Sequence, residues 1–535
     1  MGLMDNTSID PSALVSQLIT SISWSSFAQA SLALLLGFYL YSYWRYRSFS
    51  LHKLPGPPAD RYFLGILPSL LGSQSEAPQT AWHAKYGPTL QTPFLPFPFY
   101  SSFQTTDPTA LNYIVSHPDF FPKPEYIRTE IASVGGVGLV VAEGDQHRKQ
   151  RKVLNGCFTP AAIAGMIVEG ISDETPSLTP PQPMDQVAEG RKVDVMRYII
   201  QATFDIIGLT GFGYQFNQLQ QKGVEDELSK AYGNLYTASI EFPTVRVIPT
   251  KRMKVAATAY GTAARFGMRM IKDKKAAAKI EGVGKKDGGT DLISILALPP
   301  EQRLSDLEVV DQITTFMVAA NDTTALVLTW CLYYMARFPA IQERLRTELS
   351  SVHDERPSLE TLNSSPYLDA FVREVIRLSP SVPSSTRSAK KNAVIPLRHP
   401  VVGRDGKMMN RVEIPKGTDI YISIIAINTS PLYYGPDAAE FNPDRFLGPQ
   451  AENDIPGVWG GSMSFFAGPR SCIGYRFALA ELKTILFVLI NGFEFAELPS
   501  KPVMERRSAT IMRARVVGEE SLGPQMPLLV KALAF

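Results

Sequence analysis

The sequence predicts a mainly α, helix-rich protein that carries small β-sheets. Apolar residues make up 45% of the 535 residues and charged residues 19%, which is typical of a globular chain with a large core. One long helical pattern extends from Ser305 to Arg337, where it begins with a Ser-x-x-Glu capping box and ends shortly before a proline. Strand-like patterns are confined to residues 382–425, so we expect the sheets to be small.

The first predicted element is an apolar segment near the amino terminus. No charged residue lies between Asp10 and Arg45, and the apolar run is just long enough to cross a bilayer as a helix. Aromatic residues crowd its carboxyl end, and Arg45 and Arg47 follow, which predicts that the rest of the chain lies in the cytoplasm. A cleaved signal peptide would carry basic residues ahead of the run, whereas this chain has acidic ones there. A buried core helix is the other alternative.

These observations divide the chain into four parts. We predict a short lumenal segment over residues 1–24, a transmembrane anchor helix over 25–45, a basic and proline-rich linker over 46–60, and one catalytic domain over 61–535. The near-neutral net charge of +2 gives no electrostatic footprint for nucleic acid. The three cysteines form no disulfide framework, so the catalytic part is expected to face a reducing compartment.

Further elements follow from local patterns. Helices are predicted over 193–209, 366–378 and 474–491, a basic helix begins at Gly144, and short helices are predicted over 104–122. The glycine-rich stretch 133–144 lacks the spacing of a dinucleotide fingerprint and is interpreted as a flexible loop. Residues 172–186 are rich in proline, serine and threonine and predict another loop.

Cys472 is the strongest candidate for chemistry. It lies at the predicted start of a helix, whose free N–H groups and partial positive charge lower a thiol pKa and favour thiolate. Gly468 and Gly474 would let the backbone approach a flat ligand, and Arg470 could reach an acidic edge of it. A nucleophile would need a histidine base, and zinc or an iron–sulfur cluster would need more Cys or His ligands than the motifs offer. Haem needs one thiolate only, because the porphyrin supplies the other four ligands.

The residues around Cys472 also carry a family resemblance. Phe465, Gly468, Arg470, Cys472 and Gly474 reproduce the FxxGxRxCxG signature, so the chain resembles the cytochrome P-450 family from about residue 54 to its end. The resemblance implies the family's fold, haem b as cofactor and Cys472 as the axial thiolate ligand of its iron. Cys157 and Cys331 have no such surroundings and are predicted to be ordinary core thiols.

The resemblance implies partners for the two haem carboxylates. Arg387 in VPSSTR, Arg470, and Arg151 in HRKQR match the family's positions for cations that bind them. His147 stands where the family commonly has tryptophan and could donate one N–H. A solvated basic helix is the alternative for both Arg151 and His147.

The long helix carries four polar residues in an apolar context, at positions 321–324. Burying such groups is costly unless they are bonded, which indicates a function. By resemblance to the AGxDT motif, Asp322 and Thr323 guide protons to dioxygen, and Ala320 stands in the usual glycine position. The alternative is that Thr323 only bonds back to the carbonyl of Ala319 and bends the helix.

Two further motifs match the family in part. REVIR and FNPDRF place Glu374, Arg377 and Arg445 where the family buries a structural Glu–Arg–Arg triad. NTSP, which begins at Asn428, replaces the commoner HRxP, and the sequence gives no reason for this change.

Together with the apolar amino-terminal segment, the resemblance implies a membrane-anchored, eukaryotic haem-thiolate monooxygenase of fungal type. We expect it in the endoplasmic reticulum membrane as a single-pass protein with a cytosolic catalytic domain. NADPH would act indirectly, through an NADPH-cytochrome P-450 reductase that docks near the basic helix, and the substrate would be a lipophilic small molecule of specialised metabolism, such as a terpenoid. Two alternatives remain: a haem-thiolate isomerase or dehydratase that does not use dioxygen, and a non-catalytic haem-binding membrane protein.

Overall fold

A computed structural model of the chain describes most of the catalytic domain. It describes residues 24–61, 65–72, 76–93, 101–166, 190–219, 230–231, 251–280, 292–293, 304–354, 356–448, 454–508 and 511–533. The predicted lumenal segment and the predicted loop over 172–186 therefore lie outside the described residues. The helices are α2 (Trp24–Arg47), α3 (Leu67–Gly72), α4 (Ala77–Tyr86), α5 (Pro108–Ser116), α6 (Glu125–Gly135), α7 (Gly144–Leu154), α8 (Pro160–Met166), α11 (Val195–Phe212), α13 (Lys251–Ile280), α14 (Asp306–Arg337), α15 (Pro339–Ser350), α16 (Leu359–Asn363), α17 (Pro366–Leu378), α18 (Ile424–Asn428), α19 (Pro431–Tyr434) and α20 (Tyr475–Gly492).

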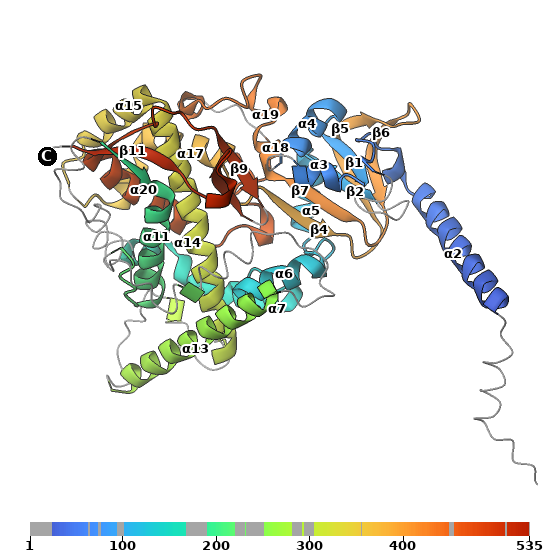
Figure 1. Cartoon of the computed structure of the whole chain (residues 1–535), viewed down its shortest axis with the longest axis horizontal. Coiled ribbons are helices and arrows are strands. Elements are labelled where there is room, and N and C mark those ends of the chain that lie inside the picture. Colours follow the sequence, from blue (N-terminus) through green and yellow to red (C-terminus); the bar gives the residue numbers. More distant parts are fainter. Residues whose placement is uncertain are drawn as a thin grey trace, which may run out of the picture.

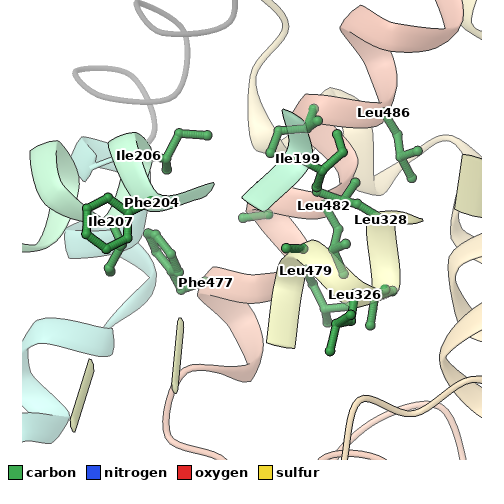
Figure 2. Close-up of a cluster of buried hydrophobic side chains, with 14 of the residues drawn as sticks. Ile199, Phe204, Ile206, Ile207, Leu326, Leu328, Phe477, Leu479, Leu482 and Leu486 are labelled. Carbon is green, nitrogen blue, oxygen red and sulfur yellow. The ribbon is translucent and has the colours of Figure 1, made fainter. Parts of the chain in front are cut away.

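The central element of the fold is the long helix α14, which begins as the sequence predicts. Ser305 caps it by accepting a hydrogen bond from the backbone N–H of Glu308, while the Glu308 carboxylate accepts one from the backbone N–H of Ser305 at 2.9 Å. Most of α14 is buried because α11 and α20 pack against it. Figure 2 shows Leu326 and Leu328 of α14 gathered with Leu482 of α20 in this apolar cluster.

The strands form four small sheets. One has four strands in the order β1–β2–β7–β4, one has three in the order β3–β11–β8, and β5–β6 and β9–β10 form two-stranded sheets. The strands are β1 (Thr89–Pro93), β2 (Ser101–Thr105), β3 (Arg191–Asp194), β4 (Ser384–Ser388), β5 (Ala393–Val402), β6 (Met408–Ile414), β7 (Asp419–Ser423), β8 (Phe493–Ala496), β9 (Met504–Ser508), β10 (Met512–Val516) and β11 (Pro527–Ala532).

The predicted fold class is confirmed, while one local prediction is wrong. Strands also form outside residues 382–425, because short segments such as β3 and β11 gain their hydrogen bonds from partners far away in sequence. The loop predicted over 133–144 is present but shorter, since α6 continues to Gly135 and α7 begins at Gly144. Helices α11, α14, α17 and α20 lie within three residues of their predicted bounds.

Helix α2 stands apart from the rest of the molecule. It projects from the body as an isolated helix, and its large apolar side chains, including Trp24, Leu34 and Trp44, are exposed (Figure 1). Near the body, Arg45 donates a hydrogen bond to the carbonyl of Lys416 at 2.6 Å. By length and mean hydropathy, the one described helix that qualifies as a membrane span is α14, which is mostly buried inside the protein. The anchor over residues 25–45 stays a prediction.

Candidate functional site

The loop that carries Cys472 is closed by its own backbone. The N–H of Cys472 donates to the carbonyl of Phe465 at 2.8 Å, and the N–H of Ser471 donates to the carbonyl of Gly468 at 3.0 Å. Phe466 adopts a left-handed conformation with φ of 59°, which is unusual for a residue with a side chain. Such backbone strain persists only where surrounding contacts enforce it, and it is found preferentially at functional sites.

Gly468 and Gly474 have different roles in this loop. Gly468 has φ of +64°, and a Cβ atom there would lie 2.7 Å from the carbonyl oxygen of Val115 in α5. Packing against α5 and the left-handed backbone therefore require glycine here, and the close approach of a flat ligand stays a prediction. A Cβ atom on Gly474 would meet only the ring of Phe158, at an ordinary contact distance of 3.5 Å.

The side chain of Cys472 is exposed, unlike those of the other two cysteines. Its side chain is accessible, yet burial raises the pKa of the thiol and outweighs the lowering effects of the Gly474 backbone and of Arg151. The predicted lowering of this pKa is therefore wrong for the thiol without a metal. The reason is that α20 begins only at Tyr475, so desolvation dominates over the helix end. Cys157 and Cys331 are buried, as predicted.

Aromatic rings gather around the cysteine loop. The ring of Phe158 lies next to Gly474, and its centroid is 5.5 Å from that of Phe316 in α14. Within the loop region, the ring of Phe465 lies 6.0 Å from Trp459 and 6.0 Å from Tyr475. An aromatic pair thus connects the loop to α14.

Three buried cations gather near the loop. Arg387 on β4 is 4% exposed, and no carboxylate pairs with it within the part of the chain that the structure describes. Burial lowers the pKa of Arg387 to about 10. Arg470 pairs with Glu143, and Lys123 lies 3.7 Å from the same carboxylate. Burial, together with the charges of Arg387 and Arg470, lowers the pKa of Lys123 well below its usual value.

This cluster carries more positive than negative charge. Leaving buried charges unpaired is costly, so the surplus creates a site for an anion. Lys123 and Glu143 were not predicted, because neither belongs to a motif that the sequence analysis used. In the sequence, Lys123 stands out only as a lysine between two prolines, and this pattern does not by itself indicate a binding site.

Arg151 and His147 lie on α7, next to the cysteine loop. Arg151 is half-buried and donates to the carbonyl of Ser471 at 2.6 Å. With Lys152 and Pro469 they line a surface cavity of about 380 Å³. Burial and the charges of Lys123 and Arg151 lower the pKa of His147 to about 4, so the ring is neutral and can donate one N–H.

The predicted Glu–Arg–Arg cluster is present. Glu374 and Arg377, both fully buried, form a two-fold contact at 2.7 Å, and Arg445 lies 3.5 Å from the same carboxylate. Asn428 explains what NTSP does: its amide donates to Ser464 at 2.8 Å and accepts from the N–H of Met463 at 3.0 Å, while its carbonyl accepts from Arg377 at 2.7 Å. Asn428 therefore links the Glu–Arg–Arg cluster to residues 463–464, which immediately precede the Cys472 loop.

The polar turn of α14 is bonded on several sides. Asp322 is buried and pairs with Arg513 on β10. Thr323 donates to the carbonyl of Ala319 at 2.7 Å, which is the back-bond that the structural alternative requires. Asn321 accepts from Thr203 on α11 at 2.5 Å. The structure thus contains the Thr323–Ala319 hydrogen bond that the helix-bending alternative requires. It also shows that Asp322 pairs with Arg513, a partner that the sequence analysis did not predict.

The donor set fits haem b. Haem offers an iron that takes one axial thiolate, a flat apolar ring and two carboxylates. Cys472 supplies an exposed sulfur, aromatic rings lie around its loop, and the cations beside the loop exceed the carboxylates. The described residues contain no cluster of three or more His, Cys, Asp or Glu side chains that would hold a different metal.

Comparison with known proteins gives the same result for nearly the whole chain. The cytochrome P-450 family model matches residues 55–516. A cytochrome P-450 monooxygenase of Postia placenta is 38% identical over 90% of this chain and 92% of the relative, and a second one from that fungus is 36% identical over 90% and 93%. A ganoderic acid synthetase of Ganoderma lucidum is 31% identical over 90% of this chain and 94% of that enzyme. The chain belongs to the cytochrome P-450 family, whose members are haem-thiolate oxidoreductases that use molecular oxygen.

Proposed function

We propose that this chain inserts one oxygen atom from dioxygen into a lipophilic small molecule of specialised metabolism, with terpenoids as the favoured class. The observation that carries the reaction type is the accessible Cys472 beside a cluster of buried cations with surplus positive charge. The terpenoid class is suggested by the ganoderic acid synthetase among the relatives.

In this proposal Cys472 would be the thiolate ligand of haem b. Haem bound there would supply the activation of dioxygen and the transfer of one oxygen atom. Arg387, Arg470 and Arg151 would hold the two carboxylates, and neutral His147 would donate one N–H to them. Arg470 also pairs with Glu143, which fixes its guanidinium beside the loop.

Asp322 and Thr323 are the proposed proton-handling pair. Oδ2 of Asp322 is engaged by Arg513, whereas Oδ1 has no hydrogen-bond partner among the described residues. The hydroxyl of Thr323 donates to Ala319, so it can still accept a hydrogen bond from a water molecule. The pair can therefore hold a water at this turn and pass a proton through it.

The location and electron donor are also proposals. Helix α2, with its exposed apolar side chains and its two terminal arginines, would anchor the protein in the endoplasmic reticulum membrane with the catalytic domain in the cytosol. Electrons from NADPH would arrive through a membrane-bound reductase. The exposed face of α7 carries Arg148, Lys149 and Lys152, and it would suit an acidic flavoprotein, although Arg148 also pairs with Asp119 and Lys149 with Glu308.

The test is turnover in microsomes that contain the protein and an NADPH-cytochrome P-450 reductase. A panel of terpenoids and fatty acids is supplied with NADPH, and products are identified by mass. We expect a product that is heavier by one oxygen atom and that requires NADPH. Product formation without NADPH would instead support an isomerase or dehydratase. The Cys472→Ser variant is the matched control and should give no product.

A further inference from the structure

Asp322 has a partner from a distant part of the chain. Its Oδ2 accepts a hydrogen bond from Nη2 of Arg513, which lies on strand β10, 191 residues away. The side chains are 1% and 11% exposed, so both charges lie out of solvent. Burying an ion pair removes the hydration of two charges, and this cost can exceed the attraction between them. Such a pair is therefore not explained by stability alone.

The same turn of α14 is held by two more segments. Thr203 of α11 donates to Oδ1 of Asn321 at 2.5 Å. Ser381, in the loop between α17 and β4, donates to the carbonyl of Thr323 at 2.6 Å. The backbone N–H of Met512, the neighbour of Arg513, donates to the carbonyl of Ser381 at 2.8 Å. Strand β10 therefore reaches this turn twice: directly through Arg513 and indirectly through Ser381.

The ion pair leaves one oxygen of the acid unused. Oδ1 of Asp322 is buried and has no hydrogen-bond partner among the described residues. Burial raises the pKa of Asp322, and the charge and hydrogen bond of Arg513 oppose that rise. Arg513 thus engages one oxygen of the carboxylate and favours its charged form, while the other oxygen has no hydrogen-bond partner among the described residues.

We propose that Arg513 is a positioning residue for Asp322: it fixes Oδ2 and so leaves Oδ1 as the oxygen that exchanges a proton with a water molecule at this turn. This inference rests on the proposed function. It adds to that function a residue on strand β10, outside every motif, that fixes the orientation of the acid.

A purely structural ion pair predicts a different outcome. It would lower the stability of the protein when either partner is removed, but it would not affect the polarity next to a ligand bound at the haem. Carbon monoxide bound to the reduced holoprotein is a suitable probe, because its infrared stretching band responds to nearby hydrogen-bond donors. Recording the band in water and in deuterated water tests whether an exchangeable proton lies beside the probe.

The experiment compares wild type with Arg513→Gln, Arg513→Lys and Arg515→Gln as full-length holoproteins. Arg515 is the matched control, because it lies on the same strand but donates to the carbonyl of Glu520 and does not contact Asp322. We expect Arg513→Gln to shift the band and to remove its response to deuterated water, Arg513→Lys to retain most of that response, and Arg515→Gln to behave like wild type. An unchanged band in Arg513→Gln, or a Lys variant no better than Gln, would overturn the proposal.

A double-mutant cycle covers the case in which Arg513→Gln folds poorly. Asp322→Asn with Arg513→Gln removes both charges and leaves neither one buried alone. Its urea midpoint should fall by clearly less than the sum of the two single changes, and additive midpoints would show that the pair does not interact. Failure of the proposed function is distinguishable, since the wild type itself would then give no NADPH-dependent oxygenated product, whatever the carbon monoxide band of Arg513→Gln shows.

Discussion

The loop around Cys472 and the polar turn of α14 are built in contrasting ways. The backbone of the loop is closed by short-range contacts, such as Cys472 N–H to Phe465. The turn is defined by long-range contacts from α11, the 381 loop and β10. The difference teaches that the backbone path of the cysteine loop is fixed by local sequence, whereas the polar turn of α14 and the charges around the loop, such as Glu143 beside Arg470, are fixed by the tertiary fold.

The largest expected effect is on the cysteine loop itself. Cys472→Ser keeps nearly the same volume but removes the thiolate, and an alkoxide is unfavourable at neutral pH. We therefore expect loss of haem, or haem without the spectrum of a thiolate complex when the reduced protein binds carbon monoxide. Cys157→Ser, a buried cysteine of the short 3-10 helix Asn155–Phe158, is the control and should keep that spectrum. A Cys472→Ser protein with the thiolate spectrum would falsify the assignment.

The second largest effect is expected at the Glu–Arg–Arg cluster, where a substitution should lower the stability of the protein. Glu374→Gln should leave Arg377, which is fully buried, without its counter-charge. Breaking such a buried network costs about 3–5 kcal/mol of the free energy of unfolding. Urea denaturation and haem content measure the loss. Glu343→Gln removes an exposed partner of Arg346 and should cost about 0–1 kcal/mol. Normal stability with lost turnover in Glu374→Gln would contradict the structural role.

These two regions also show what the sequence could and could not predict. The helices around the site were predictable because their apolar period, caps and prolines are local features. The roles of Cys472, Arg387 and Glu374 were inferred through motifs. Lys123, Glu143 and Arg513 were missed, because their importance comes from neighbours that the fold brings together. The pKa of Cys472 was misjudged for the same reason: desolvation is set by everything that surrounds the thiol.

A third prediction tests the turn of α14. If Thr323 holds a water for proton transfer, Thr323→Ala should keep haem and substrate binding but lower product formation by about 100-fold or more, with peroxide released instead. NADPH oxidation should fall much less. If Thr323 only bends α14 through its bond to Ala319, the product formed per NADPH should stay the same while substrate affinity changes. Measuring product, peroxide and NADPH together separates the two outcomes. Thr329→Ala, which removes a similar back-bond to Ala325, is the matched control.

The smallest expected effect lies at the four-stranded sheet that carries Arg387. Glu76 precedes α4, adopts a left-handed conformation with φ of 62°, and its carboxyl group accepts hydrogen bonds from Tyr421 and from Ser423 of β7. Burial raises the pKa of Glu76 from 4.5 to about 7, and the hydroxyl groups oppose this rise only in part. Between about pH 4.5 and 7, Glu76 is therefore protonated in the folded protein but ionised in the unfolded chain.

The sign of the resulting pH dependence follows from that difference. The stabilisation from Glu76 is fully present below about pH 4.5 and is lost as the pH rises through about 7, with a total of at most about 3 kcal/mol. Glu76→Gln mimics the protonated acid, so the variant should be more stable than wild type at pH 8, and the difference should shrink towards pH 5. Glu413→Gln, on the exposed face of β6, is the control and should show no such trend. Urea midpoints at several pH values measure both variants. Parallel curves for wild type and Glu76→Gln would mean that this carboxyl group does not titrate differently in the folded protein.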